Sequence, residues 1–183
     1  MTLLQTHRFL LRPIEQSDAP VFARLCNDKL IARNTARIPY PYTLEDAEIF
    51  TKTAAAAFRN GKEHAFAVCE QDTIIACCGV MRITNILFEL GYWVAMPARG
   101  RGVATEAASA VTHFAFTALH AETLLAGHFA DNPASGRVLE KIGFHHTGDT
   151  RLQFSLGRGG EAQSLRMKLD REAFNAPESV KFA

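Results

Sequence analysis

The chain of 183 residues has little of several features that mark specialised classes of protein. It has no run of about 18 apolar residues, the length that a membrane-spanning helix needs. Its first residues alternate polar and apolar side chains, unlike the apolar core of a signal peptide. Its 20 lysines and arginines balance 19 acidic residues, so no overall positive field attracts nucleic acid or an anionic membrane. We therefore expect a cytoplasmic protein with no nucleic-acid or membrane partner.

Patterns for metal binding and for disulfides are also scarce. The four cysteines lack the C-x-x-C spacing, and two of them are adjacent in an apolar segment: Cys26, Cys69, Cys77 and Cys78. The seven histidines form no set of metal ligands. We expect buried, reduced thiols and no metal. One histidine, His128, has two interpretations, as a residue that lines a binding site for an amine or as an ordinary packed or surface side chain.

The composition is that of an ordinary globular protein, with 48% hydrophobic and 21% charged residues, enough to bury a core. We expect one domain over residues 1–183, with a compact core from about 3 to 172 and a short C-terminal tail. Strand-like segments lie near 3–14, 64–70, 74–83, 86–94, 123–130, 146–156 and 162–169. Helical patterns follow residue 18 and cover about 43–60, 104–119 and 133–141. The pattern predicts an α/β fold with a mixed, largely antiparallel sheet of about seven strands and about four helices.

A glycine-rich turn joins the strand near 86–94 to the helix near 104–119. Such a turn exposes unpaired backbone N–H groups at the positive end of the helix dipole, which suits a pyrophosphate. Gly100 and Gly102 would allow unusual dihedral angles and close backbone approach, and Arg99 or Arg101 would add charged hydrogen bonds. The predicted pyrophosphate cradle comprises Arg99, Gly100, Arg101, Gly102, Val103, Ala104 and Thr105.

A glycine-rich turn of this kind is also compatible with structures that bind no pyrophosphate or bind a different nucleotide. Capping turns and exposed Arg-Gly loops are common, so the turn alone is weak evidence. A P-loop would need a lysine followed by serine or threonine, and this turn has no lysine. The sequence pattern of a dinucleotide-binding turn is partly matched by Gly100, Gly102 and Glu122. However, Thr105 takes the place of its third small residue. Glu122 also lies before the strand near 123–130, whereas the acid that binds the ribose in a dinucleotide site lies at the far end of its strand.

The turn and a second segment resemble the GNAT N-acetyltransferase superfamily. Its pyrophosphate pattern Q/R-x-x-G-x-G/A is matched by Arg99, Gly102 and Ala104. Residues 132–135 and 138–144 look like the second cofactor element of that family, and residues 89–93 resemble its branch of ribosomal-protein N-terminal acetyltransferases. The resemblance covers nearly the whole chain. It implies a GNAT-like sheet that splays beside the glycine-rich turn, so that acetyl-CoA enters between its two halves.

The resemblance also implies a mechanism, in which a primary amine attacks the thioester of acetyl-CoA directly. The acceptor would be a protein N-terminal amine or a small-molecule amine. Glu89 would be the general base, with a solvated or ion-paired strand carboxylate as the alternative. Backbone N–H groups of Trp93 and Val94, where the family's central strand bulges, would polarise the thioester carbonyl.

The tyrosine that many members use to protonate the leaving thiolate is replaced here by Leu139. Ser135, one helical turn earlier, is the candidate substitute, although a water molecule could serve and Ser135 could be a simple first-turn hydroxyl or cofactor contact. Asn132 would contact the pantetheine amides, cap the helix, or do both.

Two rival functions remain open in the sequence. One is a non-catalytic acyl-CoA-binding or regulatory domain, which would keep the cofactor residues but make no use of Glu89 or Ser135. The other is a dinucleotide enzyme. The choice of acceptor is expected to lie in the loops at residues 39–42 and 157–160, and a homodimer is left open.

Overall fold

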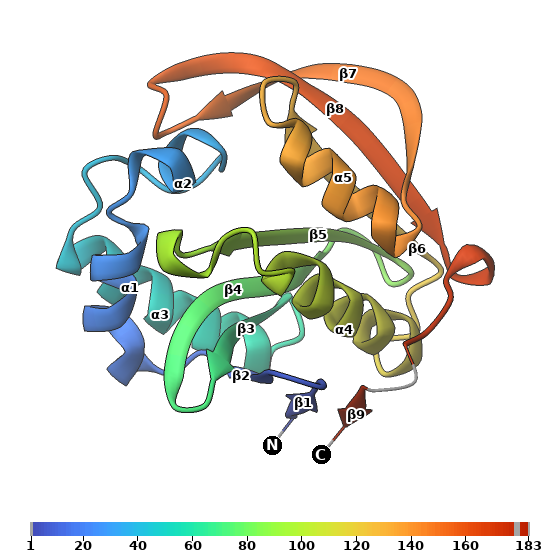
Figure 1. Ribbon diagram of the computed structural model, residues 1–183, viewed down its shortest axis with the longest axis horizontal. Helices are drawn as coiled ribbons and strands as arrows, with labels where there is room; N and C mark the ends of the chain where they lie inside the picture. Colours follow the sequence, from blue (N-terminus) through green and yellow to red (C-terminus); the bar gives the residue numbers. More distant parts are fainter. Residues whose placement is uncertain (1, 178–179, 183) are drawn as a thin grey trace.

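The computed structural model describes residues 2–177 and 180–182. In this part of the chain the strands form one nine-stranded sheet in the order β7-β8-β6-β5-β4-β3-β2-β1-β9 (Figure 1). The strands are β1 Leu4–Gln5, β2 Leu10–Pro13, β3 Glu63–Glu70, β4 Thr73–Arg82, β5 Leu87–Val94, β6 Thr123–Phe129, β7 His145–Ser155, β8 Gly160–Asp170 and β9 Lys181–Phe182. The helices are α1 Ala19–Cys26, α2 Lys29–Arg33, α3 Leu44–Arg59, α4 Val103–Thr117 and α5 Pro133–Ile142, with short 3-10 turns at Gln16–Asp18, Met96–Ala98 and Arg171–Ala173.

The predicted fold class is confirmed, because every described strand pairing is antiparallel except that of β5 with β6. Two strands exceed the expected seven. The first predicted strand is split by a tight turn, in which the Thr6 amide donates to the Phe9 carbonyl, and β9 adds a strand beside β1. The five-residue helix α2 was not predicted, because it is too short to show a helical period.

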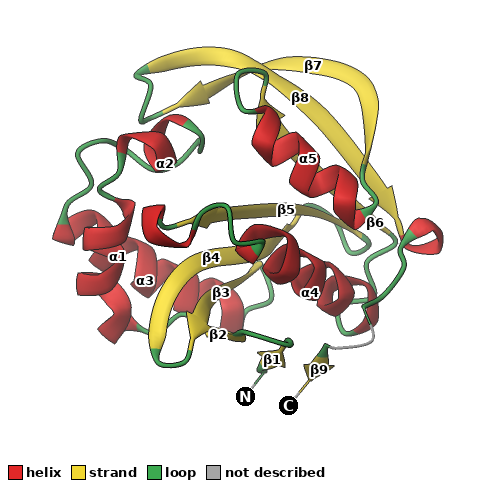
Figure 2. Ribbon diagram, viewed as in Figure 1, coloured by secondary structure: helices red, strands yellow, loops and turns green. Residues whose placement is uncertain are grey.

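Helices cover both faces of the sheet (Figure 2). The apolar side of α4 packs on one face in a cluster that includes Leu139 and Ile142 of α5. The other face carries α1 and α3, whose core includes Phe22 and Trp93. Alanines are frequent on the buried side of α4, and their small side chains let the helix lie close to the sheet. Among the described residues, no helix is both long and apolar enough to cross a membrane.

The sheet divides at the junction of β5 and β6. These strands pair from Leu87 opposite Thr123 to Glu89 opposite Leu125. Beyond Glu89, β5 stays in register with β4 as far as Val94, whereas β6 continues along β8. The two halves therefore diverge on the side where α5 lies (Figure 1). This is the splayed sheet that the resemblance implies.

Candidate active site

The predicted cofactor residues form a tight turn at the start of α4; residues 99–105 are called the cofactor turn below. Gly100 and Gly102 have φ of +74° and +77°, a region that side chains other than glycine rarely adopt. Gly102 is the N-cap of α4 and provides no capping side chain. The first N–H groups of the helix are thus left without a side-chain acceptor at an end that favours anions.

Both arginines of the cofactor turn are held by carboxylates. Arg99 donates from Nη2 to Asp28 at 2.6 Å and from Nε to the Val94 carbonyl at 3.1 Å. Arg101 donates to Glu70 at 2.6 Å. Asp28 also caps α2, so Arg99 ties the cofactor turn to that helix. The arrangement leaves the backbone amides, more than the two guanidinium groups, available to an anion.

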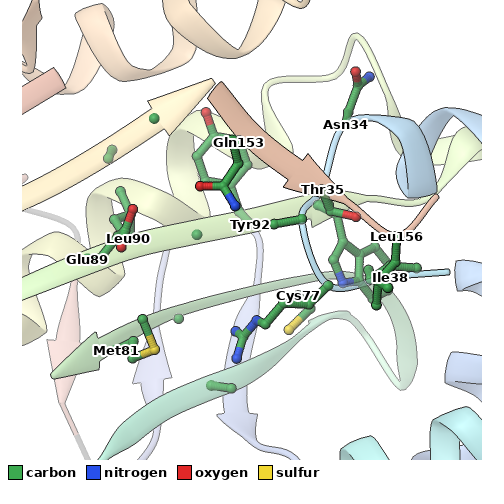
Figure 3. Close-up of a pocket in the computed structure, with 18 of the residues that line it drawn as sticks. Asn34, Thr35, Ile38, Cys77, Met81, Glu89, Leu90, Tyr92, Gln153 and Leu156 are labelled. Carbon is green, nitrogen blue, oxygen red and sulfur yellow. The ribbon is translucent and has the colours of Figure 1, made fainter. Parts of the chain in front are cut away.

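A cavity of about 770 Å³ lies along β5. Its lining includes Glu89, Trp93 and Ser135, three residues that the sequence predicted for the site. Figure 3 shows Glu89 and Tyr92 on β5, with Thr35 and Leu156 brought to the cavity from distant parts of the chain. The strand that leads to the cofactor turn therefore also forms one wall of the cavity.

Glu89 lines this cavity and is also ion-paired. Its Oε1 accepts a hydrogen bond from Arg166 Nη2 on β8 at 2.7 Å. The side chain of Glu89 is 31% exposed and that of Arg166 is 14% exposed, so the pair is accessible from the carboxylate side. The two interpretations of Glu89 coexist in this geometry, because the ion pair uses one carboxylate oxygen and the cavity gives access to the group.

The end of β5 differs from the expectation of a bulge. Its register with β4 is unbroken as far as Val94 opposite Ala76, and the next amide, of Ala95, donates to Ile75. Because amides in an antiparallel ladder alternate in direction, the Trp93 amide points toward β4 and the Val94 amide points toward the open edge. The Val94 carbonyl, which shares that direction, accepts from Arg99. In this geometry the Trp93 amide faces β4, which leaves the Val94 amide as the candidate donor, and the Trp93 ring contributes to the cavity wall.

The first turn of α5 brings Asn132 and Ser135 together. Asn132 is the N-cap, and its Oδ1 accepts from the Ser135 amide at 3.4 Å. The Ser135 hydroxyl lies 2.9 Å from the hydroxyl of Tyr92, which reaches it from β5. Leu139 is buried in the core, with 1% exposure. Tyr92 was not predicted as a site residue, although its alternation with Leu90 and Val94 could have placed it on the α5 side of β5.

His128 combines features of both of its interpretations. It lines the cavity, yet it is buried and packs against the backbone of α5 at Gly136. Its Nδ1 lies 3.0 Å from the Phe129 carbonyl, which can only accept, so Nδ1 carries the proton. The ring therefore presents its Nε2 toward α5 at Gly136.

The other side of the cavity is closed by two segments, residues 32–39 and 153–158, called the roof below. Ser155 donates from Oγ to the Thr35 carbonyl at 2.7 Å. Gly157 lies so near the backbone of Ala32 that a side chain there would overlap it. Leu156 lines the cavity, whereas the predicted acceptor loop at 157–160 serves mainly to fasten the roof.

A three-residue clasp holds the two segments of the roof to the turn before α5. Asp131 accepts two hydrogen bonds from Arg158, at 2.8 and 3.0 Å, and one from Arg33. The guanidinium of Arg158 also lies 4.4 Å from the ring centre of Phe129, a cavity residue. Hydrogen bonds and charge from Arg158, and then from Arg33, lower the pKa of Asp131 to about 2. The clasp thus stays ionised at neutral pH.

Within residues 2–177 and 180–182, no three histidine, cysteine, aspartate or glutamate side chains are grouped so that they could hold a metal ion.

Comparison with known proteins agrees with this geometry. Residues 8–145 match the model of the family described as "Acetyltransferase (GNAT) domain". An uncharacterized N-acetyltransferase of Bacillus subtilis (strain 168), YoaA, is 29% identical over 154 residues, which cover 81% of this chain and 86% of the relative.

Solved structures share the fold at low sequence identity. RimJ of Mycobacterium smegmatis in complex with CoA-disulfide has a TM-score of 0.83 at 20% identity, covering 94% of this chain and 88% of that one. RimL, a ribosomal L7/L12 alpha-N-protein acetyltransferase solved with coenzyme A, has a TM-score of 0.81 at 18% identity, covering 92% and 97%. Because the family model spans most of the chain, the protein belongs to the GNAT family and is an acetyl-CoA-dependent N-acetyltransferase.

Proposed function

We propose that the protein transfers the acetyl group of acetyl-CoA directly to a primary amine, within one domain and without an acetylated intermediate. The observation that carries this proposal is the cofactor turn, which follows the part of β5 that has separated from β6. Its two left-handed glycines and the uncapped start of α4 suit a pyrophosphate. The backbone amides of residues 100–105 would hold that group, and Asn132 would orient the start of α5 and contact the pantetheine arm.

The chemistry of transfer would take place along β5. The Val94 amide, which faces the open edge, would donate to the thioester carbonyl as it becomes an oxyanion. Glu89 would accept the amine proton, directly or through water, because its carboxylate is accessible from the cavity. Ser135 would return a proton to the departing thiolate. Holding the two reactants in one cavity removes much of the entropic barrier to their reaction.

The acceptor would reach the amine site beneath the roof. Protein N-terminal amines and small-molecule amines are both candidates, since both classes present a primary amine. The RimL structure is that of an enzyme named for a ribosomal-protein acceptor, and this supports including protein N-termini. A cytoplasmic location and a homodimer stay predictions.

An acceptor panel tests this function. Release of CoA thiol from acetyl-CoA is measured with N-terminal peptides, polyamines, aminoglycosides and amino acids. Amine-dependent release with formation of an N-acetyl product is expected. Thermal stabilisation by CoA without release on any amine would support an acyl-CoA-binding domain, and stabilisation by NAD alone would support a dinucleotide protein.

The role of Glu89 is tested by Glu89→Gln. Loss of the base should lower kcat by about 100-fold and change the pH profile of turnover. Glu140→Gln, which changes a surface carboxylate beside His146, is the matched control. If Glu89→Gln kept the rate and pH profile of the parent enzyme, Glu89 would be only an ion-pair partner of Arg166.

A further inference from the structure

The hydroxyl groups of Tyr92 and Ser135 form a pair across the opening of the sheet. Tyr92 Oη lies 2.9 Å from Ser135 Oγ and 3.1 Å from the Ser135 carbonyl oxygen. Tyr92 comes from β5 and Ser135 from the first turn of α5, 43 residues apart in the chain. The pair therefore joins β5 to α5 across the gap that opens between β5 and β6 after Glu89.

Under the proposed function, the pair lies close to the point where the thiolate would leave. Both residues line the cavity, and Tyr92 is separated by one residue from Val94, whose amide faces the open edge. Leu139, at the position of the usual tyrosine, is buried and has no hydroxyl. A phenol is therefore present where the sheet opens, but it comes from Tyr92 on β5 and not from α5, the helix that carries Leu139.

The hydrogen-bond inventory of the pair permits two arrangements. In one, Tyr92 donates to the Ser135 carbonyl and the Ser135 hydroxyl donates to Tyr92. In the other, Tyr92 donates to Ser135 Oγ, and the proton of Ser135 is free to point into the cavity. Only the second arrangement offers a donor to a sulfur atom, and rotation of two hydroxyl groups interconverts them.

We propose that Tyr92 is a positioning residue that directs the Ser135 proton toward the leaving thiolate. This inference rests on the proposed function. As the C–S bond breaks, its electron pair stays on sulfur, and sulfur takes the proton of Ser135 Oγ. Ser135 takes the proton of Tyr92 Oη, and Tyr92 regains a proton from water. The proton that the amine lost passes through Glu89 to water, so the protons balance.

The environment of Tyr92 favours this role. Burial raises the pKa of the Tyr92 phenol, while its hydrogen bond with Ser135 acts in the opposite direction. The phenol thus keeps its proton at neutral pH and can donate it. Cys78, opposite Tyr92 on β4, is also buried, and burial raises the pKa of its thiol, so no neighbouring thiolate competes for the proton.

The test combines three variants, with kcat and KM measured on an amine that the parent enzyme acetylates. Tyr92→Phe keeps the ring and removes the hydroxyl, and it should lower kcat by about tenfold with little change in either KM. Ser135→Ala should lower kcat at least as much. The double variant should be no slower than Ser135→Ala, because the two hydroxyl groups act as one unit. Ser17→Ala, an exposed hydroxyl deletion, is the control.

A fluorinated tyrosine at position 92 separates the proposed role from simple packing. Fluorine makes the phenol more acidic with little change in its shape, so kcat at neutral pH should change with the acidity of the phenol. A packing role would leave kcat unchanged. An unchanged kcat in the fluorinated enzyme, additive effects in the double variant, or a folded Tyr92→Phe enzyme with parental kcat would overturn the proposal. If the parent enzyme acetylated no amine, the proposed function would fail first, and this inference with it.

Discussion

The cofactor turn is made from one continuous stretch of chain, whereas the roof is assembled from segments more than a hundred residues apart. In the turn, Gly100 and Gly102 fix the backbone locally and α4 begins at once. In the roof, Ser155 donates to the Thr35 carbonyl and Arg158 donates to the Arg33 carbonyl. A region of the first kind depends on backbone conformation, and one of the second kind depends on side-chain contacts. The two should therefore respond to mutation in different kinetic parameters.

Among the variants that test this comparison, Gly102→Val should change the kinetic parameters most. A β-branched residue at φ +77° is strained, and the strain would displace the backbone that is proposed to hold the pyrophosphate. We expect KM for acetyl-CoA to rise by at least about tenfold, with loss of the thermal shift that CoA produces. Steady-state kinetics and thermal unfolding with CoA measure both.

The control for this variant is Gly148→Val, since Gly148 also has a positive φ, of +85°, but lies in β7 away from the cofactor turn. It should lose similar stability and keep its affinity for CoA. Equal losses of CoA binding in the two variants would show that Gly102 acts only through general stability, and the contrast between turn and roof would weaken.

Asp131→Asn tests the roof. The neutral amide cannot hold two guanidinium groups as a carboxylate does, so the two segments should separate more readily. We expect KM for the amine to rise by about fivefold, while KM for acetyl-CoA stays close to that of the parent. A rise confined to acetyl-CoA would contradict the division of roles.

The pKa of Asp131 adds a pH test of the same clasp. Its pKa in the folded protein is about 2, below the usual carboxylate value near 4. A lowered pKa means that the clasp stabilises the fold above about pH 4 and loses this contribution as the pH falls toward 2. The difference in melting temperature between the parent and Asp131→Asn should therefore be constant from pH 5 to 8 and shrink in acid.

The same contrast explains what the sequence could predict. The glycine-rich turn, the long helices and the β3-β4-β5 meander follow from local patterns, and the structure contains them. The roof, the helix α2 and the contact of Tyr92 with Ser135 depend on which distant segments meet. Alternating side chains indicated the face of β5 on which Tyr92 lies, but only the folded sheet shows that α5 stands opposite it. The pairing of Glu89 with Arg166 was hidden for the same reason.

Arg99 joins the two regions, and its removal should have the smallest but most distributed effect. Its guanidinium connects Val94, the last residue of β5, with Asp28 at the start of α2, which leads into the roof. Arg99→Gln should therefore raise KM for both substrates by about threefold. Arg101→Gln should raise KM for acetyl-CoA alone, because the partner of Arg101 is Glu70, the last residue of β3.

If Arg99→Gln changed only KM for acetyl-CoA, the turn and the roof would be independent, and the ion pair with Asp28 would be a local feature of the turn. Arg99→Gln should raise KM for both substrates about threefold in the parent enzyme and should cause no further rise in an enzyme that already carries Asp28→Asn. This outcome would show that the cofactor turn and the roof are positioned together.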